Sequence, residues 1–237
     1  MGKIMYLFLF GLLACQQVDQ CLEATGSFVE EQRSLPFFHR VEVYDGIHLS
    51  LENKEGSAIK VQATEPDQVS LEVREDSTLV IRQLNRCRWK NTAAPVISLP
   101  AKQLSLVRNH SFGTIKSLDT LQLETFFIEN IDVNGIIALQ LEARFVSIYS
   151  NAGAEINLSG SSQTLQIFTQ GWGKINAQHL QARQVQVLHN GQNDVAVSPI
   201  ERLTAEIKNF GNLHVYHQPA HQEIQLVAGT GKVIFKQ

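Results

Sequence analysis

Apolar residues recur along the second half of the chain in short alternating pairs, spaced about 20 residues apart. One series of pairs advances by 19, 20, 20 and 19 residues: Val146/Ile148, Leu165/Ile167, Val185/Val187, Ala205/Ile207 and Ile224/Leu226. A second series lies between them and advances by 19, 20, 18 and 20 residues: Ile156/Leu158, Ile175/Ala177, Val195/Val197, Leu213/Val215 and Val233/Phe235. A fixed period of this length is typical of solenoids and stacked repeat arrays. The pattern therefore predicts six or seven repeat units from about residue 104 onward.

Each unit predicts two short strands joined by two kinds of turn. Apolar and polar residues alternate within the strands, which places one face of each strand in a core and the other in water. Tight turns rich in Gly and Asn follow the first strand, at 151–153, 171–173, 190–191, 209–211 and 229–231, and we expect these residues to adopt positive φ. Looser turns rich in Ser and Pro follow the second strand, and we expect Pro199 and Pro219 to end strands there.

Two architectures fit this rhythm. In a β-helix, each strand pairs in parallel with its counterpart one period later, whereas in a meander neighbouring strands pair antiparallel. The alternation of two turn classes favours the β-helix, because a meander needs only one kind of turn. A single unit is too small to form a core of its own, so the units must stack. We therefore predict an all-β solenoid with two-strand coils of about 20 residues over residues 104–237.

Residues 34–103 also carry strand signals, but their spacing is less regular. Short apolar-alternating runs are found at 41–43, 47–51, 59–61, 69–73, 79–81 and 96–99. This region is either an irregular start of the same solenoid or a β layer that caps its end. A cap is expected, because an open solenoid end exposes strand edges and invites aggregation.

The beginning of the chain resembles the signal peptide of a bacterial lipoprotein. Lys3 is followed by an apolar run over residues 4–13, which is shorter than the roughly 20 residues that a spanning helix needs. Ala14 then precedes Cys15, the expected lipid acceptor after cleavage of residues 1–14. Ordinary secretion with a chance cysteine is the alternative. Residues 15–33 are mostly polar and predict a tether, so we expect a chain anchored by acyl groups in the cell envelope, at the outer membrane.

Two further cysteines, Cys21 and Cys87, remain after Cys15. A disulfide is permitted in an exported protein, although pairing would require the tether to fold back toward the loop near residue 87. The cysteine spacing does not match a metal site, and no cofactor is expected. Among the histidines, His214 and His217 fall on opposite faces of a strand and we expect them to be solvated rather than metal-bound. The net charge of −3 does not suggest nucleic-acid binding.

The repeat also gives a test for catalysis, because catalytic acids on a solenoid would form a column across successive coils. Acidic residues are instead scattered among the turns: Glu129, Asp132, Glu155 and Asp194. We therefore predict a non-enzymatic protein.

Two groups of exposed side chains are candidates for a ligand surface. The first is a basic loop with an aromatic residue, formed by Arg86, Arg88, Trp89 and Lys90, which has the chemistry to bind an acidic glycan or phosphate head groups. The second is a pair of aromatic residues at tight turns, Trp172 and Phe210, which would stack on sugar rings if exposed. The alternatives are a solvated loop and packing between neighbouring turns.

Over residues 37–237 the sequence resembles the auto-transporter adhesin head GIN domain family of bacterial envelope proteins. The resemblance lies in FHRVEVYDGI at 38–47, EDSTLVI at 75–81, NFGNLHVY at 209–216 and AGTGKVI at 228–234. It implies a pectin-lyase-like β-helix and a role in adhesion to a surface glycan or protein, with no established catalytic residues. A polysaccharide-binding module derived from a glycan-active protein and a structural envelope component are the alternatives. The protein could also assemble as a homo-oligomer.

Overall fold

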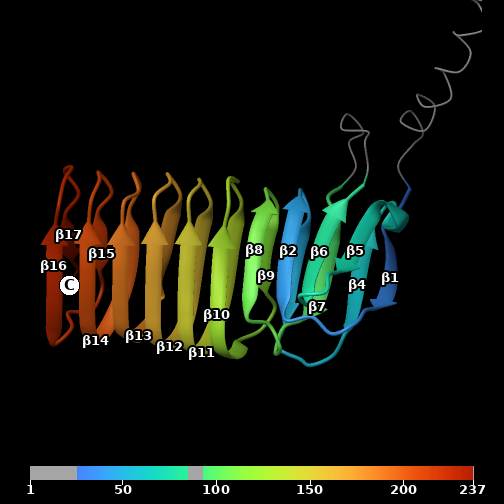
Figure 1. Ribbon diagram of the computed structural model, residues 1–237, viewed down its shortest axis with the longest axis horizontal. Coiled ribbons are helices and arrows are strands. Elements are labelled where there is room, and N and C mark those ends of the chain that lie inside the picture. Colours follow the sequence, from blue (N-terminus) through green and yellow to red (C-terminus); the bar gives the residue numbers. More distant parts are fainter. Residues whose placement is uncertain (1–25, 85–92, 237) are drawn as a thin grey trace, which may run out of the picture.

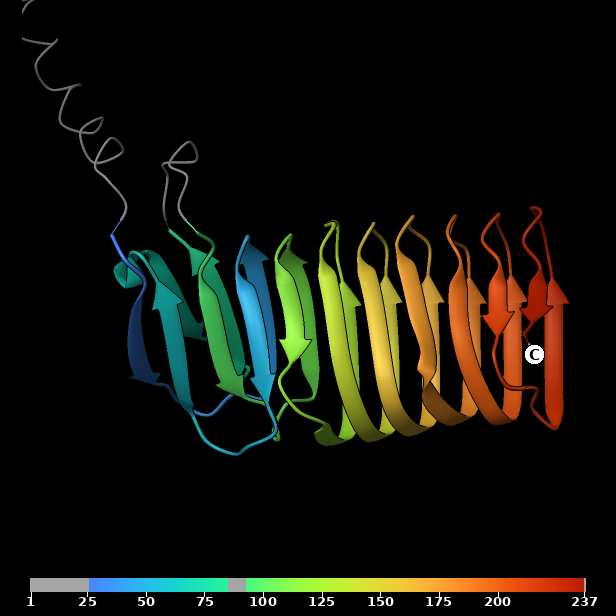
Figure 2. The ribbon, with the colours of Figure 1, turned by 180° about the vertical axis from the view of Figure 1, so that it is seen from behind.

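A computed structural model describes residues 26–84 and 93–236 of the 237-residue chain. This part of the chain is almost entirely β-structure, with one short 3-10 helix, η1 (Pro66–Gln68). The strands stack side by side into an elongated, flattened solenoid of two layers (Figures 1 and 2). The predicted all-β solenoid is therefore confirmed. Cys15, Cys21 and Cys87, on which the expected lipid anchor and disulfide depend, lie outside the described residues.

The regular half of the solenoid is built from parallel strands whose partners lie about 20 residues apart. These strands are β10 (Leu121–Asn130), β11 (Ile136–Ser150), β12 (Glu155–Thr169), β13 (Lys174–His189), β14 (Val195–Ile207), β15 (Leu213–Val215), β16 (His221–Leu226) and β17 (Val233–Phe235). The parallel pairing confirms the β-helix and excludes the meander. We call each turn of the solenoid a rung, which contributes one strand segment to a first layer and one to a second layer.

The register agrees with the predicted repeat except at one strand. The second series of apolar positions is in register from Ile156 through Ile175, Val195 and Leu213 to Val233. In the first series the prediction is wrong at β14, because Ala205 pairs with Val187 rather than with Val185. The cause is a pair of register shifts between β13 and β14, at 177–181 and 182–184, which shorten the local repeat by two residues.

The predicted looser turns are bends inside long strands. Strands β11 to β14 each run from the second layer into the first without interruption. Pro199 therefore does not end a strand: it lies inside β14 opposite Ala182, at the shift in register. Pro219 does separate two strands, β15 and β16. We call this side of the solenoid the bent edge and the opposite side, where the tight turns line up, the turn edge (Figure 1).

The turn glycines are explained by close stacking rather than by backbone conformation. Of the glycines in the predicted tight turns, only Gly229 has a positive φ, 77°. A Cβ atom at Gly173 would collide with the carbonyl oxygens of Ala152 and Ala154 in the preceding turn. The successive turns thus approach so closely that they leave no room for a side chain, which corrects the expected reason for glycine there.

The N-terminal rungs are stacked out of chain order. Their strands are β2 (Arg40–Asp45), β3 (His48–Glu52), β6 (Thr78–Gln83), β7 (Val96–Pro100), β8 (Leu106–Ser111) and β9 (Thr114–Ser117). In the first layer, β2 lies in parallel between β6 and β8. In the second layer, β3 lies in parallel between β7 and β9. The rung that comes first in the chain is thus inserted between two later ones, which is why these residues show no regular spacing.

Three antiparallel strands cover the N-terminal end: β1 (Val29–Ser34), β4 (Ala58–Ala63) and β5 (Val69–Val73). β5 pairs with β6, while β4 pairs with β7 and carries β1 on its other side. The predicted tether over 15–33 therefore extends too far, because its last residues form a strand. Their polar side chains are accounted for by their place at the sheet edge, where charge hinders further strand addition.

The core fills the space between the two layers as one continuous cluster of apolar side chains. A column of buried polar residues interrupts it at the turn edge of the first layer: Asn109, Asn130, Ser150, Thr169 and His189. Nδ2 of Asn109 donates a 2.8 Å hydrogen bond to Oδ1 of Asn130. This bond satisfies one donor and one acceptor that would otherwise be costly to bury, whereas Oγ of Ser150 and Nε2 of His189 have no hydrogen-bond partner among the described residues.

Candidate functional site

The outer face of the first layer carries a row of apolar side chains across successive strands. Tyr149, Phe168 and Leu188 are in register on β11, β12 and β13 and point away from the core. The rings of Tyr149 and Phe168 are stacked, with centroids 5.4 Å apart and an interplanar angle of 9°. Phe127 and Phe145 form a tilted pair nearby, with centroids 5.9 Å apart. We call these four aromatic residues, together with Leu188, the aromatic stripe.

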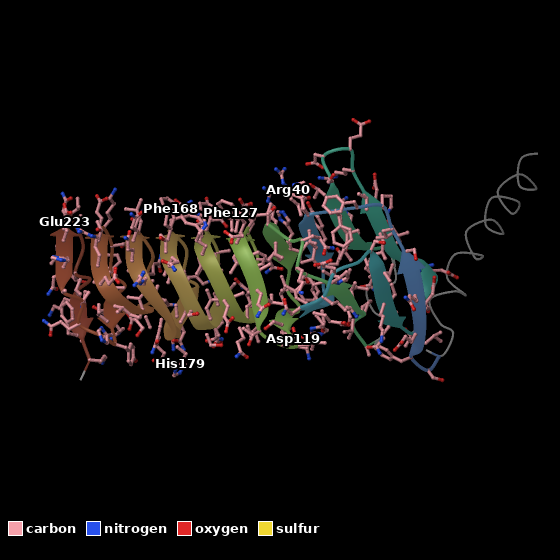
Figure 3. The ribbon with its side chains drawn as sticks, turned by 90° about the horizontal axis from the view of Figure 1, so that it is seen from below. Arg40, Asp119, Phe127, Phe168, His179 and Glu223 are labelled. Atoms are coloured by element: carbon pink, nitrogen blue, oxygen red, sulfur yellow. The ribbon has the colours of Figure 1, made fainter. Side chains whose placement is uncertain are left out.

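The same face carries charged groups at both ends of the stripe. Figure 3 places Arg40, Phe127, Phe168 and Glu223 along one side of the solenoid, with Asp119 and His179 on the opposite side. Side chains alternate between the two faces of a strand, so the positions next to the buried ones face solvent. A ligand that lies along this face would therefore meet several strands at once.

A shallow groove of about 500 Å³ runs beside the stripe. Phe168 and Leu188 form an apolar part of its lining. Its polar lining is formed by Ser147, Gln166, Gln186, Thr204, Glu206, Glu223 and Gln225. Nε2 of Gln166 donates a 2.8 Å hydrogen bond to Oε1 of Gln186, which orders two amides on neighbouring strands. The groove thus combines apolar surface with amide, hydroxyl and carboxylate groups, as ligand sites commonly do.

At the N-terminal end of this face, ion pairs join neighbouring strands. Glu42, whose side chain is 7% exposed, accepts hydrogen bonds from Arg108 at 2.7 Å and from Arg74 at 3.2 Å. Arg108 also bonds Glu129 at 2.6 Å. Because these charges satisfy one another, the cluster fixes the neighbouring strands together rather than offering a free cation to a ligand.

A second aromatic stack lies beside this cluster. The rings of Tyr44 and His110 are parallel, with centroids 4.5 Å apart, and the guanidinium of Arg82 lies 4.3 Å from the centre of the Tyr44 ring. Burial lowers the pKa of His110 below its ordinary value of 6.5. The imidazole is therefore mostly neutral at pH 7, which suits stacking against the tyrosine.

The sequence-predicted candidates lie elsewhere. Trp172 and Phe210 are on the turn edge, 55% and 61% exposed, and the turn at 190–194 separates them. Trp172 lies over Gly153 of the preceding turn, where a Cβ atom would collide with its indole nitrogen. Packing between turns is therefore observed for Trp172, although half of its surface stays accessible. Arg86, Arg88, Trp89 and Lys90 lie outside the described residues.

Of the histidines near the C-terminus, His214 is partly buried, whereas His217 is exposed as expected. Nε2 of His214 lies 2.8 Å from Oδ2 of Asp194, and Nδ1 of His217 lies 3.0 Å from the carbonyl oxygen of Pro199. Burial disfavours the Asp194 carboxylate, but hydrogen bonds from Asn212 and His214 outweigh this and lower its pKa below 3.8. Within residues 26–84 and 93–236, no group of three His, Cys, Asp or Glu side chains is placed to hold a metal ion.

Sequence reasoning missed the aromatic stripe, although its signal was available. Tyr149, Phe168 and Leu188 are spaced by 19 and 20 residues, which is the period of the apolar core positions. Following the same period through the outward positions would have aligned them. The bonds of Glu42 to Arg108 had no comparable signal, because they depend on the stacking of β2 against β8.

The chain belongs to the family described as putative auto-transporter adhesin, head GIN domain, whose model matches residues 37–219. This membership confirms the resemblance and suggests a location at the cell envelope or surface. No described helix is long and apolar enough to cross a membrane. No curated protein matches the chain.

Solved structures share the fold at low sequence identity. A putative adhesin from Bacteroides fragilis superposes with a TM-score of 0.79 at 16% identity, covering 89% of this chain and 97% of its own. A putative lipid binding protein from Parabacteroides distasonis gives a TM-score of 0.67 at 16% identity, covering 90% and 98%. A putative adhesin from Parabacteroides merdae gives 0.61 at 14% identity, with the same coverage. At these identities the likeness establishes the solenoid architecture alone.

Proposed function

We propose that this chain is a non-enzymatic adhesin of the bacterial cell envelope, held to the outer membrane by acyl groups on Cys15. Its binding surface is the aromatic stripe with the adjoining groove, and its ligand is a surface polysaccharide. The family's adhesin description supports the adhesive role. The lining of the groove is the observation that supports a polysaccharide ligand, because apolar side chains and hydrogen-bonding groups lie side by side in it.

This arrangement suits the chemistry of sugars. A sugar ring presents C–H groups on its faces and hydroxyl groups around its rim, so it needs apolar and hydrogen-bonding surface together. Phe168 and Leu188 supply the apolar surface, while the paired amides of Gln166 and Gln186 supply donors and acceptors. The amides already hold each other, which reduces the ordering cost of binding.

The repeat makes a linear polymer the most suitable ligand. Neighbouring strands are about 4.7–4.9 Å apart, so a chain lying along the solenoid axis meets similar side chains at regular intervals. Each contact is weak, but several engaged strands add up along one chain. Anchoring of many copies in one membrane would strengthen adhesion further by multivalency.

A glycan array tests the ligand assignment. The wild-type protein is expected to bind a subset of polysaccharides, and Phe168→Ala and Gln166→Ala should each reduce that binding. Phe210→Ala is the matched control, since it removes an exposed aromatic side chain outside the groove. Loss of binding in Phe210→Ala but not in Phe168→Ala would move the site to the turn edge. An array without hits would leave a structural envelope role.

Two assays separate adhesion from the remaining alternatives. Incubation with the bound polysaccharide should release no new reducing ends, whereas their appearance would show a glycan-cleaving enzyme. Protease treatment of intact cells should remove an adhesin exposed on the surface. Complete protection of the chain would place it in the periplasm and contradict cell-surface adhesion.

A further inference from the structure

The two ends of the solenoid differ in whether further strands cover the last rung. The antiparallel strands β1, β4 and β5 cover the N-terminal end. At the C-terminal end, β16 pairs only with β14, and β17 pairs only with β15. No described strand lies beyond them (Figure 1). This last rung therefore presents unpaired backbone groups on two strand edges at once.

The last rung also leaves part of the core exposed. Leu226 and Phe235 pair with buried core residues of the preceding rung and lie at inward-facing positions, but they are 60% and 38% exposed. One rung earlier, Ile207 and Val215 hold the same columns and are 1% and 0% exposed. Ile224 is likewise 37% exposed, against 2% for Ala205 before it. Another layer of side chains would bury these three residues as the solenoid buries their counterparts.

Within residues 26–84 and 93–236, no segment of this chain supplies that layer. The solved relatives leave only 2–3% of their own chains outside the shared fold. That share is smaller than the 19–20 residues of one rung, so those chains carry no further rung beyond the fold they share with this one.

We propose that a second copy of this chain covers the last rung, so that two solenoids join at their C-terminal ends. β16 of each copy pairs antiparallel with β17 of the other, around a two-fold axis parallel to the strands. Such an axis exchanges the two layers, so the first layer of one copy continues into the second layer of its partner. The contact is isologous, and both exposed core ends become buried.

Two symmetric pairings are possible at this end: β16 can pair with β17 of the partner, or β16 can pair with β16 of the partner. The distribution of charged residues favours the first. The acidic residue of β16 is Glu223, whereas Lys232 and Lys236 flank β17. Pairing β16 with β17 of the partner brings acid toward base. Pairing β16 with its own copy, centred on Ile224, would place the two Glu223 carboxylates diagonally across the strands, where like charges repel.

Head-to-tail stacking onto the N-terminal end is disfavoured by the groups found there. The edge strand β1 carries Glu30, Glu31 and Arg33. The guanidinium of Arg33 also occupies backbone groups of the cap, donating to the carbonyl oxygens of Val69 at 2.7 Å and Pro66 at 2.9 Å. Charged edges of this kind prevent strand addition, so the assembly closes as a dimer rather than growing into a filament.

The dimer has a defined relation to the membrane. β1 runs antiparallel to β4, and β4 antiparallel to β7, so β1 begins at the turn edge (Figure 1). A two-fold axis parallel to the strands keeps both turn edges on one side of the dimer. Both tethers therefore start from that side, which suits two anchors in one bilayer. This last agreement rests on the proposed lipid anchor, whereas the strand pairing does not.

Sedimentation velocity of the detergent-extracted full chain tests the proposal. The wild type is expected to sediment as a dimer that dissociates on dilution, and Leu226→Asp should weaken the dimer at least about tenfold. Leu118→Asp is the matched control, because Leu118 is similarly exposed, at 56%, but lies outside the last rung. Circular dichroism spectra would show that both variants retain the solenoid.

A charge exchange tests the register. Glu223→Lys should weaken the dimer about tenfold, since the contact occurs twice, and Glu223→Lys combined with Lys236→Glu should restore it. A monomeric wild type at about 100 µM would overturn the proposal, as would filaments. A dimer that Leu226→Asp leaves intact would place the contact elsewhere, and failure of the double exchange to restore association would reject the pairing of β16 with β17.

Discussion

Nη1 of Arg108 donates a 2.7 Å hydrogen bond to Oε1 of Glu42, although the two residues are 66 positions apart in the chain. The bond joins β8 to β2 and so holds the rung that is inserted out of chain order. The second carboxylate oxygen of Glu42 accepts from Arg74 and from the hydroxyl of Tyr44, at 3.2 and 3.1 Å. The carboxylate thus ties β2 to β8 and to the turn between β5 and β6, at the junction between the cap and the regular solenoid.

Replacing Glu42 by Gln should therefore destabilise the protein. The change leaves the guanidinium of Arg108 without one of its two acidic partners, and we expect a loss of about 2–3 kcal/mol in the free energy of unfolding. Urea titration monitored by circular dichroism measures it. Glu124→Gln is the control: Glu124 also pairs with an arginine, Arg144, at 2.9 Å, but both side chains are largely exposed. Equal effects of the two substitutions would contradict the special role of Glu42.

The repeat was predictable from the sequence because the pairing is periodic. Positions such as Ile156, Ile175 and Val195 must lie one above another if each rung has the same length. The predicted register is wrong at β14, where the repeat shortens by two residues. Alternating aliphatic positions look alike in the sequence, so a shift of two residues leaves no visible sign. The order of the N-terminal rungs could not be predicted from a repeat, because β2 pairs with β6 and β8, which are distant from it in the chain.

The candidate site was only partly accessible from sequence for a related reason. Exposed aromatic residues at glycine turns, such as Trp172, are conspicuous in a sequence, whereas Tyr149 and Phe168 are inconspicuous within strands. Their stacking becomes visible only once the outward positions of neighbouring strands are aligned. The cluster around Glu42 required the three-dimensional order of the rungs.

Gly160, at the bend of β12, should not tolerate a side chain. Its φ is 109°, and a Cβ atom would collide with the carbonyl oxygen of Leu141 on the neighbouring strand. We expect Gly160→Ala to cost about 2–4 kcal/mol of stability. Gly56→Ala separates the two causes. Gly56 has a φ of 129°, but a Cβ atom there would meet no other atom within 4 Å, so only backbone strain of about 1 kcal/mol remains. Thermal unfolding of both variants checks this, and equal costs would show that the collision is relieved.

His189 should make stability depend on pH. The residue is 1% exposed, and its Nδ1 accepts a 3.2 Å hydrogen bond from the backbone N–H of Gly191, so the neutral ring carries its proton on Nε2. Burial lowers its pKa below the ordinary 6.5. As the pH falls below 6.5, the unfolded chain binds a proton that the folded chain rejects. The free energy of unfolding should therefore decrease with falling pH, by at most about 1.4 kcal/mol per pH unit from this group.

The substitution His189→Asn should flatten this dependence. Urea unfolding between pH 5 and pH 8 measures the slope, and a smaller slope is expected in the variant whatever its overall stability. His110, whose pKa is lowered by burial as well, leaves some slope of the same sign. The same substitution at the exposed His221 is the control. An unchanged slope in His189→Asn would show that the ring is protonated without penalty in the folded state.

The lipid anchor gives a prediction that is independent of the fold. Cys15→Ala removes the thiol that would carry the acyl groups, so the protein should move from the membrane fraction to the soluble fraction of lysed cells. Cys21→Ala, which changes a nearby cysteine, should leave the protein in the membrane fraction. Unchanged membrane partitioning of Cys15→Ala would refute the anchor.

The most direct test of the proposed adhesion is a binding titration of the purified protein with a polysaccharide identified on the array. We expect saturable binding, a dissociation constant at least about tenfold higher for Phe168→Ala, and little change for Phe210→Ala. Equal affinities of the wild type and Phe168→Ala would contradict the assignment of the aromatic stripe and its groove as the ligand-binding surface.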